Sequence, residues 1–397
     1  MTQPSQPSAL SGRLTLMLAT ACGLIVANIY YAQPLIGEIS RSLGLSPQAA
    51  GFIVTMTQIG YGLGLLFIVP LGDLFENRSL TLCVMGVGTL ALATAIFANG
   101  ATLFLTAAVF IGLGSVAVQI LVPYAAHLSA PALRGKAVGN VMSGLMLGIM
   151  LARPVSSLIT HLSSWRTVFA VSTLVMIALT LILRYVLPVR RPAPGLRYRE
   201  LMASIGGLAA HNIVLRRRGL YHAALFGAFS LFWTVTPLLL TGPEFHLTQV
   251  GVALFAFAGV AGAIAAPVAG RVADRGLSQP ATLFAMAAVG TAFLITHIGD
   301  TGSALRLGIL VLAAIVLDFG VTMNLVIGQR AIFALGEHYR SRLNGIYMAT
   351  FFVGGAIGSA LGGWAYAQGG WALASLLGTL LPALALCYFS TERFAEE

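Results

Sequence analysis

The sequence predicts an all-α membrane protein in which twelve transmembrane helices form two pseudo-symmetric six-helix bundles. The first observation is composition: of 397 residues, 58% are hydrophobic and 9% are charged, whereas soluble proteins carry roughly 25% charged residues. The second is that the apolar residues form long continuous runs, which indicate helices rather than barrel strands. The third is a repeat. The short charged loops at 70–78 and 270–276 each lie between two apolar runs, and Trp165 aligns with Trp371. This pattern indicates one membrane unit built twice around a central site.

Each predicted span holds the roughly 20 apolar residues that a helix needs to cross the hydrocarbon core. The spans cover approximately residues 14–36, 48–70, 80–98, 101–126, 137–161, 165–187, 219–241, 249–270, 280–298, 305–329, 343–367 and 371–389. They give an N-terminal bundle over 1–187, a cytoplasmic linker over 188–218 and a C-terminal bundle over 219–397. Within the linker, Tyr198 to Ala210 is predicted to form an amphipathic helix along the inner membrane surface, because Leu201, Ile205 and Leu208 share one side.

The basic residues predict the orientation. With both termini in the cytoplasm, only Arg41, Arg166 and Arg306 of the 22 Lys and Arg residues fall on the outer side, as the positive-inside rule requires. The basic loops then face the anionic cytoplasmic leaflet, so the net charge of +10 is explained without a nucleic-acid partner.

Several function classes are excluded by what the sequence lacks. The three cysteines, Cys22, Cys83 and Cys387, all lie in apolar runs, so we expect neither a disulfide framework nor a metal site. The sequence has no nucleotide-binding loop and no pattern typical of an enzyme. We therefore expect no ATP drive and no cofactor.

Small residues mark helix faces suited to close packing. Gly354, Gly358 and Gly362 lie on one face of the eleventh predicted span, and Gly259 and Gly270 lie on one face of the eighth. Such faces let membrane helices approach closely.

Four segments carry a resemblance to a known family. They are Asn28-Ile-Tyr-Tyr-Ala-Gln-Pro34, Gly60-Tyr-Gly-Leu-Gly64, Pro70-Leu-Gly-Asp73 and Arg134-Gly-Lys-Ala-Val-Gly139. On these segments the chain resembles the major facilitator superfamily, in its 12-span drug:proton antiporter branch, and is similar to bacterial nucleoside and sugar efflux pumps. The resemblance implies the major facilitator fold and a monomer in a bacterial inner membrane. It also implies that small organic molecules or drugs are exported in exchange for protons by alternating access. Two alternatives stay open: a proton-coupled importer of a small solute, and a non-transporting sensor or channel built on a transporter fold.

Charged residues inside the predicted spans are the candidates for proton coupling. Asp318 lies near mid-depth in the tenth span, which lines the central cavity in the family fold. Since a carboxyl group removed from water is easier to protonate, Asp318 is predicted to load and release a proton. The alternative is a hydrogen-bonded structural role.

Arg153 lies deep in the fifth span, where the family has the glycine of a Gly-Pro pair. A cation at that depth faces a cavity or a carboxylate. Glu38, near the outer end of the first span, is the competing proton carrier and the natural partner of Arg153 in an alternative structural salt bridge. Direct pairing of Arg153 with Asp318 is not assumed.

Candidate substrate contacts are polar and aromatic residues on the spans near the predicted cavity, several of them co-facial at helical spacing. They are Asn28, Tyr31, Gln58, Gln119, Trp233, Asn324, Tyr347 and Phe351. For any single aromatic residue, packing or lipid contact is the alternative. Four histidines, which lie near predicted membrane boundaries, are expected to be solvated at the interface: His127, His161, His222 and His297.

The two charged loops are the candidate gates. In the family fold, they lie beside the inner ends of spans eleven and five, which are positively polarised helix N-termini. Asp73 and Asp274 are therefore predicted to stabilise a closed inner face, with Arg78, Arg275 and Arg342 completing charge networks. The alternative is that these loop charges only set the topology.

Overall fold

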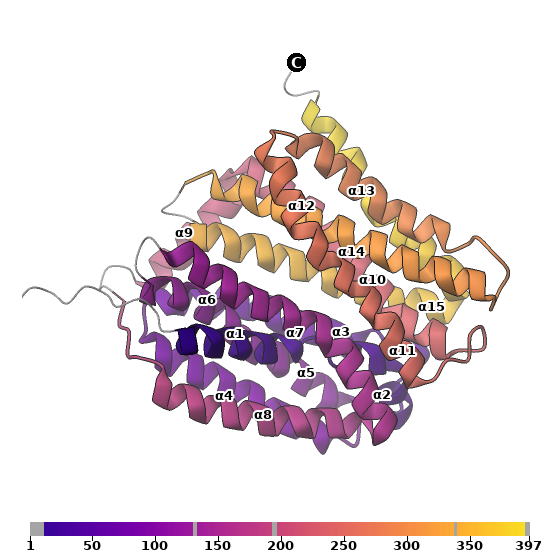
Figure 1. Ribbon diagram of the computed structural model, residues 1–397, viewed down its shortest axis with the longest axis horizontal. Coiled ribbons are helices and arrows are strands. Elements are labelled where there is room, and N and C mark those ends of the chain that lie inside the picture. Colours follow the sequence, from indigo (N-terminus) through magenta and orange to yellow (C-terminus); the bar gives the residue numbers. More distant parts are fainter. Residues whose placement is uncertain (1–11, 130–132, 193–196, 337–339, 394–397) are drawn as a thin grey trace, which may run out of the picture.

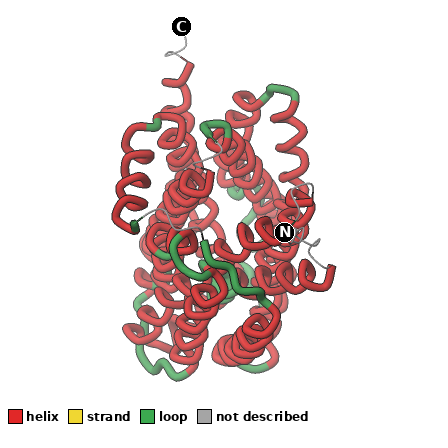
Figure 2. Tube along the Cα trace, turned by 90° about the vertical axis from the view of Figure 1, so that its left-hand side faces the viewer, coloured by secondary structure: helices red, strands yellow, loops and turns green. Residues whose placement is uncertain are grey.

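The computed structural model describes residues 12–129, 133–192, 197–336 and 340–393, and this part of the chain contains helices and no strand (Figure 2). Ten helical runs in it are long and apolar enough to cross a membrane, and the helix Gly12–Ala27 is a shorter apolar one. The predicted all-helical membrane fold is therefore confirmed.

In the first half of the chain, the described residues form eight α-helices. They are α1 (Gly12–Ala27), α2 (Ile36–Leu43), α3 (Phe52–Phe67), α4 (Asn77–Ile96), α5 (Ala101–Ser115), α6 (Ala117–Leu128), α7 (Arg134–Leu162) and α8 (Trp165–Val186). Short 3-10 helices lie at Gln33–Leu35, Pro47–Ala49 and Val69–Asp73. The first predicted span is thus α1 and α2 joined by turns over 28–32, and the fourth is α5 followed by α6.

The second half follows a linker helix, α9 (Tyr198–His211). It contains α10 (Ile213–Thr241), α11 (Gln249–Ala256), the 3-10 helix η5 (Phe257–Ala261), α12 (Gly262–Asp274), α13 (Ser278–Ile295), α14 (Ala304–Phe333) and α15 (Arg340–Arg393). The long α15 holds the last two predicted spans. They meet at Gly369 and Gly370, where the backbone is non-helical. At Gly370, φ is +59°, a conformation that favours glycine.

The two halves lie side by side, with α1–α8 in the lower part of Figure 1 and α10–α15 in the upper part. In each half, two helices cross at close range: α1 and α7 in the first half, and α10 and α15 in the second. A β-carbon on Gly148 of α7 would lie 2.1 Å from the carbonyl oxygen of Gly23 of α1. A β-carbon on Gly358 of α15 would lie 1.9 Å from that of Gly227 of α10. The first and fifth spans of each half therefore cross backbone to backbone, as expected for small residues in membrane helices.

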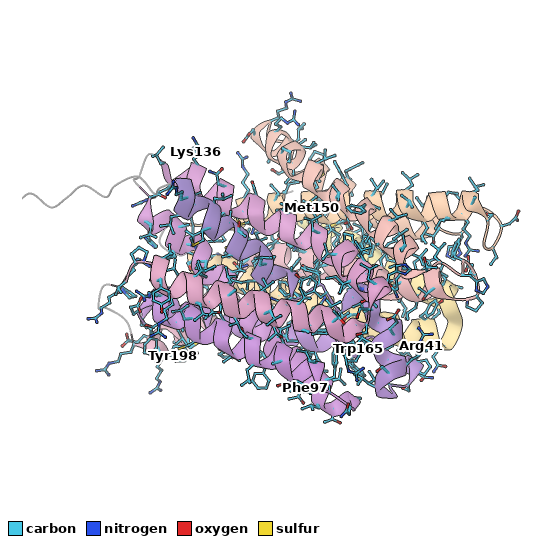
Figure 3. All side chains as sticks on the ribbon, turned by 60° about the horizontal axis from the view of Figure 1, so that its bottom comes forward. Arg41, Phe97, Lys136, Met150, Trp165 and Tyr198 are labelled. Atoms are coloured by element: carbon cyan, nitrogen blue, oxygen red, sulfur yellow. The ribbon has the colours of Figure 1, made fainter. Side chains whose placement is uncertain are left out.

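The bundle has two distinct ends. Arg41, Phe97 and Trp165 lie at one end, and Lys136 and Tyr198 lie at the other, with Met150 between them (Figure 3). Trp371 begins the last span and donates a hydrogen bond of 2.8 Å from its indole nitrogen to Thr296, just after α13. The α13–α14 loop lies on the same side of the molecule as α2, opposite α9 (Figure 1). We call the end with both tryptophans the tryptophan end and the opposite end the linker end.

The helix predicted in the linker is present as α9, and it bridges the two halves at the linker end. The Tyr198 hydroxyl donates to the carbonyl oxygen of Phe67 in α3 at 3.2 Å. Arg342 of α15 donates to the Ser204 hydroxyl at 2.7 Å. The apolar side of α9 packs against protein and does not only face the membrane surface, because α15 and the start of α10 offer an apolar patch. The residues in this contact include Ile205, Leu208, Leu215, Leu343 and Tyr347.

Candidate functional site

A buried charged cluster lies where the two halves meet. Arg153 of α7 is 3% exposed, Asp318 of α14 is 5% exposed and Trp233 of α10 is 2% exposed. The indole nitrogen of Trp233 donates a hydrogen bond of 2.9 Å to a carboxyl oxygen of Asp318. The cation therefore comes from the first half, and the acidic group and its indole donor come from the second.

Aromatic rings surround the guanidinium group of Arg153. Its central carbon lies 4.5 Å from the ring centre of Trp233, 5.0 Å from that of Tyr30 and 5.3 Å from that of Phe229. Each distance is within the range of a cation–π attraction, which is strongest when the cation is removed from water. The Nε–H of Arg153 donates a bond of 2.7 Å to the side-chain oxygen of Gln33.

Gly259 brings η5 against this cluster. A β-carbon there would lie 2.9 Å from Asp318 Oδ2, 3.3 Å from a ring carbon of Trp233 and 3.7 Å from Arg153 Nη1. The two charged groups thus face each other across a residue without a side chain. Asp318 Oδ2 and Arg153 Nη1 both lie within 4 Å of that β-carbon position, although the two residues are not among the ion pairs of the described residues.

The structural salt bridge between Arg153 and Glu38, considered from the sequence, is not formed. Glu38 accepts a 3.0 Å hydrogen bond from the side-chain amide of Gln249 at the start of α11, and Arg153 bonds Gln33. Glu38 is partly exposed. Its bond links the two halves near the tryptophan end.

Several predicted substrate contacts form a second cluster on the same face of α10. The Asn324 side-chain amide lies 3.0 Å from His222 Nδ1. His222 stacks on Phe351 at 4.6 Å between ring centres and on Tyr347 at 5.4 Å. Phe351 in turn stacks on Phe226 at 3.6 Å. This stack of rings leads toward Phe229 and Trp233.

The expected interfacial solvation of His222 is wrong, because the side chain is fully buried among these rings. The other three histidines, His127, His161 and His297, are exposed.

The remaining predicted substrate contacts differ in where their polar groups point. Gln58 of α3 donates to the Ser230 hydroxyl of α10 at 2.6 Å, across the junction of the halves. Asn28 accepts from Ser172 and donates to backbone within the first half. Gln119 donates to the Tyr61 hydroxyl at 3.0 Å, also within the first half. Tyr31 is partly buried against the apolar core.

Gln33, Tyr30 and Phe229 are site residues that the sequence did not single out. The pairing of Asn28 with Tyr31 assumed continuous helical spacing, but α1 ends at Ala27 and turns follow. Pro34, which has no N–H to donate, is the signal for this break. The turns present Tyr30 to Arg153 in place of Tyr31.

The predicted gating residues lie at the linker end. Asp73 and Arg342 line one small crevice together with Ile205 of α9, which matches the predicted position beside span eleven. Asp274 forms an ion pair with Arg330 of α14, within its own half, rather than lying against span five. Arg275 is exposed, and Arg78 is partly buried.

At the linker end, the surfaces of α7 and α12 around Gly139 and Gly270 are open. A β-carbon on Gly139 of α7 or Gly270 of α12 would meet nothing within 4 Å. A cavity of about 450 Å³ lies beside α7 within the first half, lined by Lys136, Asn140 and Ser143 of α7 and by residues of α1 and the α6–α7 region. In Figure 1, α12 diverges from α7 toward the linker end.

Comparisons with known proteins agree with this architecture. A family model described as Major Facilitator Superfamily matches residues 16–332. The chain is 39% identical to the transporter YgaY of Escherichia coli O157:H7 over 96% of this chain and 95% of that one. It is 33% identical to the probable transporter SCO4007 of Streptomyces coelicolor over 92% of this chain and 84% of that one.

Solved structures share the fold at low identity. A mutant of the nucleoside transporter NupG aligns with a TM-score of 0.77 at 13% identity, over 96% of this chain and 99% of that chain. The human organic anion transporter MFSD10 aligns with a TM-score of 0.65 at 16% identity, over 94% and 97% of the two chains. The protein is therefore a multi-pass, non-enzymatic membrane transporter acting on a small-molecule substrate, and it belongs to the Major Facilitator Superfamily.

Proposed function

We propose that the protein is a proton-coupled secondary active transporter that exports small organic molecules, as in the drug:proton antiporter branch. In this proposal it is a monomer of a bacterial inner membrane, with both termini in the cytoplasm. Asp318 takes up and releases the coupling proton, and Arg153 provides a fixed positive charge beside it.

The observation that supports this proposal is the burial of Asp318 and Arg153 at the junction of the halves. A charge removed from water is costly unless it is paired, coordinated or neutralised. Asp318 has the Trp233 indole as its hydrogen-bond donor and Arg153 across Gly259. The free energy of ionising a carboxyl group at this position depends on the relative arrangement of the two halves. Proton binding is thereby linked to the conformational change.

The proposed substrate region continues from this cluster along α10. Trp233, Phe351 and Tyr347 provide aromatic surface, and Asn324 and Gln58 provide amides. The side-chain oxygens of Gln58 and Asn324 and the hydroxyl of Tyr347 are buried without a hydrogen-bond partner among the described residues. Such groups favour a partner that can satisfy them. Glu38, Asn28, Tyr31 and Gln119 are less central to the proposal, because they lie at the tryptophan end or bond within the first half.

Proton-coupled uptake is a second candidate, and one observation favours it. A permanent cation close to an ionisable carboxyl makes the site prefer an anion when the carboxyl is protonated. A solute bound in this way moves with the proton and not against it. The direction therefore depends on whether solute and proton bind together or compete.

Gradient-driven flux in proteoliposomes tests the proposal. Asp318→Asn keeps the size of the side chain and cannot release a proton. We expect this variant to exchange labelled solute across the membrane at a rate close to that of the parent, and to lose accumulation driven by a pH gradient. Full gradient-driven accumulation by the variant would remove Asp318 as the carrier. A parent protein that dissipates a solute gradient without stoichiometric proton movement would instead be a channel.

A further inference from the structure

We propose that the transported solute carries a carboxylate group, and that Arg153 and Gln33 bind it. The inference rests on the proton-coupled transport proposed above, in its uptake form, and names the substrate class of the same site. Two buried hydrogen-bond donors of the cluster have no partner among the described residues.

The orientation of the Gln33 amide follows from chemistry. An arginine Nε–H can only donate, so the Gln33 atom 2.7 Å from it must be the carbonyl oxygen. The Gln33 amide nitrogen then points elsewhere. Gln33 is 1% exposed, and its nitrogen has no hydrogen-bond partner among the described residues.

Arg153 adds a second unused donor. Its Nη2 atom is buried and also has no partner. The Nε bond to Gln33 leaves this guanidinium nitrogen and the Gln33 amide nitrogen as two donors on a pair of linked side chains. A ligand group with two acceptor oxygens matches two donors, and a negative charge on it makes the bonds shorter and stronger. An ammonium group would bring a positive charge and further donors to the same place.

The space beside Arg153 is mainly apolar, and in this conformation it is too small for such a solute. A small cavity next to the guanidinium group is lined by Pro34, Trp233, Pro237, Val252 and Phe255, among others. Its volume is about 10 Å³, which is room for about one water molecule. The lining comes from both halves, so a larger solute fits only when α10 and α11 move away from the first half, as alternating access requires.

Asp318 gives the binding a pH dependence with a definite sign. The charged and titratable groups facing Asp318 are Arg153 of α7 and Tyr30 beyond α1. Trp233 of α10 donates to it, and Gly259 of η5 contributes no side chain. A solute carboxylate on Arg153 would stand near the Asp318 carboxylate when that group is ionised. Because like charges repel, the solute binds better once Asp318 is protonated. Solute and proton therefore occupy the site together, as in the proton-coupled uptake given above as the second candidate.

Ligand-induced thermal stabilisation of the purified full-length protein tests this without any transport step. The probes are three matched acid and amide pairs: benzoate and benzamide, phenylacetate and phenylacetamide, and indole-3-acetate and indole-3-acetamide. We expect at least one acid to stabilise the protein more than its amide. The apparent affinity for that acid should fall at least about tenfold in Arg153→Gln, since a charged hydrogen-bonded contact is lost. Arg218→Gln, which alters a buried arginine bonded to Thr282 in the second half, is the matched control and should keep the affinity.

Two further variants test whether the acid binds at Arg153 and whether protonation of Asp318 controls its binding. Gln33→Glu supplies an internal carboxylate to Arg153 and should abolish acid binding even if the fold is unchanged. Asp318→Asn, which resembles the protonated state, should bind the acid at pH 8 as well as the parent does at pH 6. Equal effects of acid and amide in all three pairs, the absence of any effect included, would overturn the proposal, as would undiminished acid binding in Arg153→Gln. Loss of proton-driven flux in Asp318→Asn without an acid preference would leave the proton role standing and remove only the substrate class.

Discussion

Gly51→Ala is the most direct test of how the halves close at the tryptophan end. A β-carbon on Gly51, at the start of α3, would lie 2.2 Å from the carbonyl oxygen of Ser359 and 3.3 Å from Gly363 Cα in α15. Close carbon–oxygen contacts between helices lie at about 3.3–3.6 Å. The two helices would therefore have to separate by about 1 Å, which also stretches the 2.8 Å hydrogen bond between Thr55 and Ser359.

The expected size of the effect follows from packing. Forcing one extra methyl group into a well-packed contact costs about 1–3 kcal/mol. Because this contact joins the two halves, the cost falls on the state in which they touch and not on the fold of either half. At about 1.4 kcal/mol per factor of ten, the population closed at this end should fall about 5- to 150-fold relative to the open one.

Single-molecule Förster resonance energy transfer between dyes at the tryptophan end measures the population that is closed at this end. Arg41→Cys and Asp300→Cys place one exposed label on each half, in a background with Cys83 and Cys387 changed to serine. We expect Gly51→Ala to move the distribution toward longer distances. An unchanged distribution would refute the reasoning that this contact closes the tryptophan end.

Three other predictions concern the gating loops, the proton site and the packing within the second half. Asp73→Asn and Asp274→Asn should each slow transport while leaving solute affinity within about twofold, measured by flux and binding on one preparation, since each removes a bias between states; two variants with normal rates would contradict a gating role. Glu38→Gln should retain gradient-driven accumulation, because Glu38 is partly exposed and bonds Gln249, and loss of coupling in this variant alone would move the proton site toward the tryptophan end. Gly358→Ala should lower the melting temperature in detergent, while Gly86→Ala, whose β-carbon meets nothing within 4 Å, should not lower it; equal effects would contradict the role given to the α10–α15 crossing.

The sequence was sufficient for the fold because the signals that determine it are local and repeated. Apolar runs long enough to cross the bilayer correspond to the observed helices, and the small residues Gly354 and Gly358 predicted a close crossing that the structure contains. The pairing of the two halves along α3 and α15 could not be predicted from the sequence in the same way. It depends on single contacts such as Gly51 with Ser359, which no periodic pattern marks.

The candidate site was predicted only in part. Asp318 and Arg153 are predicted inside spans because charge in a membrane helix is conspicuous, and both are buried. Their mutual arrangement could not be predicted, because depth counted along straight helices ignores the break after Ala27 and the 3-10 segment at Phe257–Ala261. Those two irregular segments bring Gln33 and Gly259 to the cluster. The prediction for His222 placed it near a membrane boundary, but α10 already begins at Ile213 and side chains of α14 and α15 cover the imidazole ring.

The two halves contact each other more extensively along α3 and α15 than between α7 and α12, and this difference restricts how they can move. The α3–α15 contact runs from Gly51 beside Ser359 to the crevice that Asp73 shares with Arg342, and α9 is bonded to both helices there. On the opposite side, α7 and α12 are apart at the linker end. Further opening of the linker end can rotate the halves about this contact, whereas opening of the tryptophan end has to separate the part of it at Gly51. Leu147 of α7 and Ile264 of α12 are exposed and apolar, so in a bilayer they lie against acyl chains, and a solute that enters between the two helices passes close to lipid as well as water.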